Sequence, residues 1–336
     1  MNRIQHLALA IGVFSLTAFA DLQYEMTSRA TGGSLVNIPI VGSRLKEPHA
    51  TVHYLRGNRM ATVSKSTSSI WDLDAGTVTT VNTDKKSYSV MTFEQMRKVM
   101  EDSMKQMQEA QGRQKNDVDY KWNVSVQDAG EDKVVAGFNA HHYILTMTGE
   151  ATDQASGGTA GTKMVIDNWM AKSVPGMKEY HEFHKRMAEK MGVDVSSGIN
   201  PMVRAQLGKG WDAASKEMIK MQGFAVLSVV KMLITQNGQD VMVPEGQKGP
   251  SASDVAKESA AGAVLGRLPG GLGGLGRKKR SEDPPPPASR PGGGAMVPAT
   301  QMEFTTELTK LVGGGFDDSV FTVPTGFKQV EDRRTR

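Results

Sequence analysis

Alternation of apolar and polar residues dominates the first part of the chain. Leu22, Tyr24 and Met26 alternate with polar neighbours, and this period of two predicts a strand with one buried face. Further short strand-like segments follow, separated by turn signals such as Arg56–Arg59 and Asp74–Gly76. We therefore predict an antiparallel meander over this part of the chain.

A long helical pattern begins after Thr92. Thr92 is a favourable N-cap, and Gln95, three residues later, completes a capping box. Apolar residues then recur at spacings of three and four, so the predicted helix has one apolar, methionine-rich face. We expect this helix to lie across the inner face of the sheet and to line an apolar pocket there. The predicted pocket-lining residues are Phe93, Met96, Met100, Met104 and Met107.

Both patterns return in the second half of the chain. Alternating segments predict further strands, and apolar residues at helical spacing predict a second long helix and two shorter ones. The strands are expected at 122–126, 143–147, 163–169, 224–232 and 302–311, and the helices at 178–191, 201–207 and 211–221.

The first twenty residues have the pattern of a secretory signal peptide. Arg3 supplies a positive start, a short apolar stretch follows, and Ala18-Phe19-Ala20 is an A-x-A cleavage site. The apolar stretch is too short for a membrane-spanning helix. We therefore predict cleavage after Ala20, a mature chain that begins at Asp21, and a periplasmic or secreted location.

The amino-acid composition excludes several kinds of functional site. The sequence contains no cysteine, which excludes disulfides, a thiol nucleophile, a thiolate metal site and an acylated cysteine. The formal charge of +4 falls to +3 when Arg3 is removed with the signal, an excess too small to indicate nucleic acid as a partner. The 21 methionines, against 10 phenylalanines and 6 tyrosines, suit surfaces that must adapt to variable shapes.

A low-complexity segment interrupts the folded pattern. Residues 244–298 are rich in Gly, Pro, Ala and Ser, and such a segment cannot bury enough apolar surface to offset its ordering entropy. We predict a disordered insertion within one domain formed by residues 21–243 and 299–330. The basic run Arg277–Arg280, next to apolar residues, could contact an anionic membrane, although a solvated linker explains it more simply.

Four segments carry a resemblance to a known family. They are Gly57–Met60, Thr77–Met91, Val135–Tyr143 and Phe321–Lys328, and their order along the chain is more specific than any one of them. Together they resemble an uncharacterised family of exported bacterial proteins whose fold is similar to the lipoprotein carriers LolA and LolB. The resemblance implies an α+β fold, a curved antiparallel half-barrel covered by helices, with an apolar interior. It implies no enzymatic activity.

Two sets of residues are candidate metal ligands. His181 and His184 lie three apart on a predicted helix, but the pattern lacks the spacing and the third ligand of a zinc protease site. The methionine stripe that starts at Met96 could bind Cu(I) through its thioethers, although a packed helix needs the same spacing. His141 and His142 would point to opposite faces of a strand. No catalytic motif is visible, so we expect neither an enzyme nor a bound cofactor.

The sequence therefore supports three hypotheses about function. The first is an exported protein that binds an apolar, lipid-like ligand between its sheet and a helical lid. The second is a structural protein whose interior is filled by its own side chains and whose partner is another envelope protein. The third is a periplasmic binder of copper or zinc that uses the methionines or the histidine pair.

Overall fold

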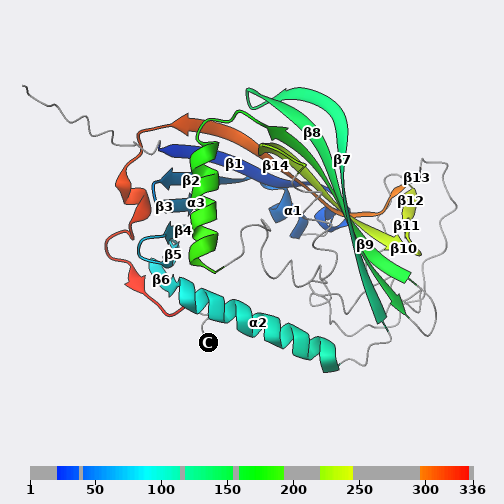
Figure 1. Ribbon diagram of the computed structural model, residues 1–336, viewed down its shortest axis with the longest axis horizontal. Helices are drawn as coiled ribbons and strands as arrows, with labels where there is room; N and C mark the ends of the chain where they lie inside the picture. Colours follow the sequence, from blue (N-terminus) through cyan, green and yellow to red (C-terminus); the bar gives the residue numbers. More distant parts are fainter. Residues whose placement is uncertain are drawn as a thin grey trace, which may run out of the picture.

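A single large sheet forms the body of the protein. The computed structural model describes residues 21–37, 41–113, 118–153, 159–192, 220–244 and 296–332 (Figure 1). The first six strands pair with their sequence neighbours as an antiparallel meander, as the alternating pattern predicts. They are β1 (Leu22–Gly32), β2 (His49–Arg56), β3 (Arg59–Val63), β4 (Thr67–Asp72), β5 (Thr77–Asn82) and β6 (Ser87–Thr92).

The second group of strands joins the meander through the end of the chain. β14 pairs with β1 on one side and with β10 on the other, and the order then continues through β9, β8 and β7. The short η1 (Ser34–Asn37) and α1 (Val41–Lys46) connect β1 to β2. The strands of this second group are β7 (Val118–Val135), β8 (Phe138–Asp153), β9 (Thr159–Ala171), β10 (Phe224–Gln236), β11 (Gln239–Asp240) and β14 (Thr300–Gly313).

The predicted half-barrel covered by a helical lid is wrong. The described residues form one open sheet of 13 strands that does not close on itself. The sheet is mixed, because the short β15 (Lys328–Gln329) pairs parallel with β6 while the other pairings are antiparallel. Helices are a minor part of the described structure and do not form a layer over this sheet.

One helix, α3 (Met177–Lys190), lies over the inner face of the meander (Figure 1). Its Phe183 side chain is fully buried, with 0 % of its surface exposed. The helix was predicted at 178–191, and its stripe of apolar residues packs into the main core. That core includes Leu22, Tyr24, Leu55, Met60, Leu73, Val78, Phe93, Val226 and Leu308 from the sheet and its connections.

Both ends of α3 are fixed to the sheet. Gly176 precedes the helix with a φ of 78°, and a Cβ at this position would lie 2.6 Å from Leu22 Cδ1, so glycine is needed twice over. At the other end the Lys190 ammonium donates to the Leu73 carbonyl oxygen at 2.6 Å. These contacts set the direction in which the helix crosses the strands.

The helix predicted to be the lid is α2 (Phe93–Arg113), and it has a different position. It starts at the edge strand β6 and runs below the meander, whereas α3 crosses the strands (Figure 1). Its capping box is present: Gln95 N donates to Thr92 Oγ1 at 3.1 Å, and Thr92 N donates to Gln95 Oε1 at 2.9 Å. An amphipathic pattern predicts that a helix has a buried face, but not which surface covers that face.

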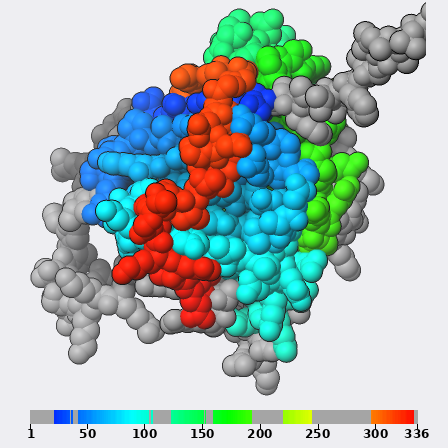
Figure 2. Space-filling model, turned by 90° about the vertical axis from the view of Figure 1, so that its left-hand side faces the viewer, coloured from blue at the N-terminus to red at the C-terminus, as the bar shows by residue number. Residues whose placement is uncertain are grey.

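The C-terminal segment packs on the outer face of the meander. Figure 2 shows this segment, in red, crossing the blue and cyan strands. It contains the short helix η4 (Asp318–Phe321) and ends near β15. Phe321 is buried in a second apolar cluster with Ala61, Ile70 and Val81, which Tyr54, Tyr88, Phe316, Val320, Val323 and Phe327 surround. The meander is therefore covered on both faces, by α3 inside and by this segment outside.

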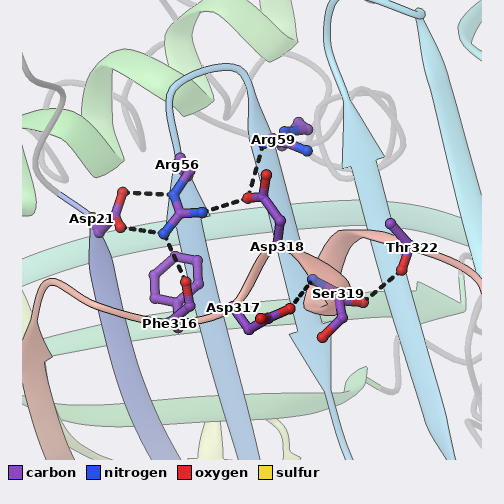
Figure 3. A network of polar contacts seen from close by, with 8 residues as sticks. All are labelled: Asp21, Arg56, Arg59, Phe316, Asp317, Asp318, Ser319 and Thr322. Carbon is purple, nitrogen blue, oxygen red and sulfur yellow. Dashed lines mark hydrogen bonds and ion pairs between the residues drawn. The ribbon is translucent and has the colours of Figure 1, made fainter.

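A polar network holds the C-terminal segment at its start (Figure 3). The Arg56 guanidinium is paired with Asp21 and with Asp318, and it also donates to the Phe316 carbonyl oxygen at 2.8 Å. Arg59 contacts Asp318 at 3.2 Å. One arginine thus links the beginning of β1, the end of β2 and the C-terminal segment.

The ends of the predicted insertion are paired with each other. β12 (Met242–Pro244) and β13 (Met296–Pro298) form a separate two-stranded antiparallel sheet, so the ordered chain extends slightly into the predicted segment. Residues 245–295, the predicted signal peptide, the predicted helix at 201–207 and all but the last two residues of the predicted helix at 211–221 lie outside the described residues, and those last two residues, 220 and 221, are not helical. In the described part of the chain, no helix is long and apolar enough to cross a bilayer.

Candidate functional site

Five adjacent strands present one continuous apolar surface. Their side chains form two parallel rows on the same face, two residues apart along each strand, and we call these rows the apolar face. The first row consists of Met302 (β14), Met232 (β10), Met164 (β9), Met147 (β8) and Val124 (β7), and the second of Phe304, Val230, Ile166, Leu145 and Val126 on the same strands.

Strand register brings the four methionines together. Met232 is the direct partner of both Met302 and Met164, and Met164 is also the partner of Met147. Directly opposite residues in an antiparallel pair lie on the same face with their Cβ atoms about 5 Å apart. Residues 147, 164, 232 and 302 lie on four different strands, and the register places them next to one another on one face of the sheet.

The other face of the same strands is mixed: it carries charged side chains together with Ile144, Val165 and Val229. Lys231 lies between Val230 and Met232, and its ammonium is 3.6 Å from the Asp167 carboxylate. Lys163 is paired with Asp240 at 2.9 Å. These charges and the apolar face occupy alternate positions, so the strands are amphipathic in the ordinary sense of a period of two.

The apolar face is only partly exposed to solvent. Eight of its ten side chains are half-buried, and only Val124 and Leu145 are buried. With strands about 4.8 Å apart, five strands give the face a width of about 19 Å. A surface of this kind is large enough to contact an extended hydrocarbon chain along its length.

A row of neutral polar side chains borders the apolar face. Asn168 on β9 is opposite Ser228 on β10 and Tyr143 on β8, and Ser228 is opposite Thr306 on β14. Ser228 Oγ donates to Asn168 Oδ1 at 2.6 Å. All four are neutral polar residue types, and we call them the polar row.

Comparisons with known proteins do not support the family resemblance. No family model, curated protein or solved structure matches the chain. The resemblance to an exported LolA-like family therefore stays a prediction that rests on four sequence segments. Function has to be inferred from the geometry of this chain's own residues.

Three of the pocket residues predicted on α2 do not belong to the apolar face. Phe93 is buried in the main core, and Met96 and Met100 are half-buried against the same core near α3. The side chains of Met104 and Met107 lie outside the described residues. The first two turns of α2 thus contribute to packing under α3, and the methionines that share a surface in the sheet come from other segments.

The two histidines of the predicted pair, His181 and His184, have different surroundings. His181 is exposed, whereas His184 is half-buried with its ring 4.2 Å from the ring of Tyr180. Among the residues that the structure describes, no three His, Cys, Asp or Glu side chains are grouped so that they could hold a metal ion. The pair therefore does not form part of a conventional zinc site within the described chain.

His184 belongs instead to a buried cluster that the sequence did not indicate. His53 stacks on Tyr24 with ring centroids 4.5 Å apart, and Thr62 is hydrogen-bonded to its Nδ1 at 3.2 Å. Burial and the neighbouring His184 lower the pKa of His53 to about 4. Burial and the nearby His181 also lower the pKa of His184. The His53 imidazole is consequently neutral at pH 7.

His141 and His142 point to opposite faces, as predicted for neighbours in a strand. The two ring nitrogens of His141 each lie 2.7 Å from a carboxylate, Asp132 at Nδ1 and Asp128 at Nε2. These hydrogen bonds raise the pKa of His141. His142 stacks on Trp169 with centroids 4.4 Å apart. The two histidines take part in separate contacts and cannot chelate one ion together.

A small cavity lies on the outer face of β1 and β14. Its volume is about 160 Å³, and it is lined by polar side chains together with one proline. Ligand pockets for drug-sized molecules usually measure about 300–1,000 Å³. This cavity is too small for a lipid, and it is on the face opposite Phe304. The lining residues are Thr27, Arg29, Pro48, Thr305, Glu307 and Thr309.

Proposed function

We propose that this chain is an exported binding protein that holds the acyl chain of a lipid-like ligand on the apolar face. The observation that carries the proposal is the register of two uncharged rows across five strands. Methionine is unbranched and polarisable, so a row of four methionines can adapt to a flexible hydrocarbon. The proposal assigns binding to this face and assigns no catalysis.

The dimensions of the face agree with an acyl chain. A bilayer core about 30 Å thick consists of two layers of acyl chains, so one chain reaches about 15 Å. The face is about 19 Å wide. Burying a chain of that length against apolar side chains is favourable because it removes hydrocarbon from water.

A matched pair of variants tests the proposal. Delipidated protein is titrated with a pyrene-labelled monoacylglycerol, and saturable binding is expected. Met147→Lys should weaken binding by at least about tenfold, because a charge among apolar groups must be desolvated when the ligand binds. Thr146→Lys, on the opposite face of the same strand, should leave binding unchanged.

Two results would contradict the proposal. One is the absence of saturable binding by the delipidated wild type. The other is an equal loss in both variants while circular dichroism shows that both are folded, which would mean that the apolar face is interior packing. That second result would favour the hypothesis of a structural protein with a filled core.

The methionine row also favours a second candidate, a Cu(I) site. Thioethers are the soft ligands that Cu(I) prefers, and Met164 has a methionine on each side of it. Replacing Met164 and Met232 by leucine keeps the volume nearly constant, at a cost of less than about 1.5 kcal/mol per site. A copper site would lose its metal in this variant, whereas an acyl-binding face would retain most of its affinity.

A further inference from the structure

Asn168 is an amide buried at the border of the apolar face. Only 9 % of its surface is exposed. Ile166 and Met164 lie two and four residues before it on the same face of β9. Its carbonyl oxygen accepts the hydrogen bond from Ser228. Its amide nitrogen donates to the sulfur of Met221 at 3.9 Å. A thioether is a weak acceptor, and the amide has two N–H groups, so donor capacity remains at a buried position.

We propose that the Asn168 amide donates a hydrogen bond to a carbonyl oxygen of the ligand, which is therefore a neutral acyl ester or acyl amide. The proposal rests on the proposed function and adds the chemical class of the ligand's polar end. Ser228 holds the amide through its carbonyl oxygen, so the nitrogen side is directed away from that bond. A buried donor that lacks a strong acceptor gains most from a ligand that supplies one.

The position of Asn168 suits this role. β9 is the middle strand of the five that form the apolar face, with β10 and β14 on one side and β8 and β7 on the other. A carbonyl bound at Asn168 therefore has apolar side chains within reach on both sides. Successive residues on one face of a strand are about 7 Å apart, so Ile166 would contact the first methylene groups of the chain.

The charges near the polar row favour a neutral ligand over an anion. The row itself, with Thr306, Ser228, Asn168 and Tyr143, offers hydroxyls and an amide and no cation. Asp128 is the cross-strand partner of Tyr143, and its carboxylate is already bonded to His141. The cationic groups at this end, His141 and Lys172, already act on the Asp128 carboxylate, so a free fatty acid or a phosphate would bring a second anion that competes with Asp128 for them, at a cost in desolvation energy.

A pair of ligands that differ only in the carbonyl tests the inference. 1-Monopalmitoylglycerol is an ester, and 1-O-hexadecylglycerol has the same head group and chain length with an ether in place of the ester. Both are used to displace a pyrene-labelled monoacylglycerol from the delipidated full chain. The wild type should prefer the ester by about tenfold, which corresponds to one hydrogen bond of about 1.4 kcal/mol.

Two variants complete the test. Asn168→Leu should abolish the ester preference while ether binding remains, and Ser228→Ala, which frees the amide, should reduce the preference if the leucine variant does not fold. An unchanged preference in either folded variant, or equal affinity of the wild type for both ligands, would overturn the inference. Failure of the wild type to bind either ligand would instead contradict the proposed function.

Discussion

Arg56 and Asp21 form a forked ion pair across the first two strands. Arg56 Nε donates to Asp21 Oδ1 at 2.8 Å, and a second guanidinium nitrogen donates to the other carboxylate oxygen. The Asp21 and Arg56 side chains are 20 % and 27 % exposed, so water screens the pair only in part. Hydrogen bonds from Arg56 hold the pKa of Asp21 below its ordinary value.

Replacing Arg56 with lysine should lower the free energy of unfolding by about 1–2 kcal/mol. Lysine keeps the charge but cannot form the fork that binds two carboxylate oxygens at once. Urea denaturation measures the effect. Arg59→Lys is the control, because Arg59 has a single ion-pair contact among the described residues, at 3.2 Å with Asp318, and otherwise lies over the Phe321 ring at 4.6 Å from its centroid. It should cost less than Arg56→Lys, about 0.5 kcal/mol. Equal effects of the two variants would contradict a special role for Arg56.

The capping box of α2 should contribute measurably to stability. Thr92→Ala removes the acceptor of the Gln95 N–H and should cost about 1 kcal/mol, seen as a lower thermal midpoint. Lys98→Ala changes an exposed residue one turn later, and its effect should stay within about 0.5 kcal/mol. If α2 frays without affecting the fold, the two variants will unfold at the same temperature.

Local sequence patterns such as this capping box account for the parts of the fold that could be predicted from the sequence. The capping box, the helix that ends at Arg113 and the second helix from Met177 to Lys190 follow from residues within a few positions of each other. The meander could be predicted for the same reason, because each strand pairs with its neighbour across a short turn. These features need no knowledge of the rest of the chain.

The apolar face could not be recovered in this way. Each of Met147, Met164, Met232 and Met302 lies in an alternating segment, but only the strand order shows that they are neighbours. The most visible methionine pattern in the sequence lies on α2, and the pocket that it predicts there stays a prediction. A stripe on a helix is a local signal, whereas a row across strands is a property of tertiary register.

Acid should destabilise the protein through the buried cluster under α3. The pKa of His53 is about 4 in the folded state, below the ordinary value of 6.5, so the unfolded state binds more protons between these values. Stability is thus complete above pH 6.5 and falls as the pH drops toward 4, by about 1–3 kcal/mol. His184 acts in the same direction, and Tyr24 and Thr62 are the other groups in contact with His53.

Denaturation curves between pH 7 and pH 4 check this expectation. His53→Phe keeps a ring that can stack on Tyr24 but cannot be protonated, so its stability should depend less on pH over the same interval. A pH dependence as steep as that of the wild type would show that another group is responsible.

His141 should respond to pH in the opposite sense. Its pKa is raised by Asp132 first and Asp128 second, so its contribution is present below pH 6.5 and is lost as the pH rises through the folded-state value. A proton-NMR titration should therefore place His141 above its ordinary pKa. Asp132→Asn should move the titration back toward that value, whereas Glu131→Gln, on the neighbouring residue, should move it less.

The segment between β12 and β13 should be replaceable. Pro244 and Met296 are paired residues of a two-stranded sheet, so a short Asn-Gly turn can connect them without moving either strand. Replacing residues 245–295 with such a turn should change the free energy of unfolding by less than about 1 kcal/mol, because closing a long loop costs little more than closing a shorter one. Loss of the folded state on replacement would show that the segment is part of the core.

The place of β1 in the sheet determines when the protein can fold. The first strand of the chain lies between β2 and β14, and the hydroxyls of Thr27 and Thr309, which are 282 residues apart, are within 3.3 Å of each other. Such distant pairing is slow, since chain entropy must be lost before the contacts form. For a polypeptide exported as proposed, this delay keeps the chain extended until its last strand has emerged, and translocation does not have to compete with folding.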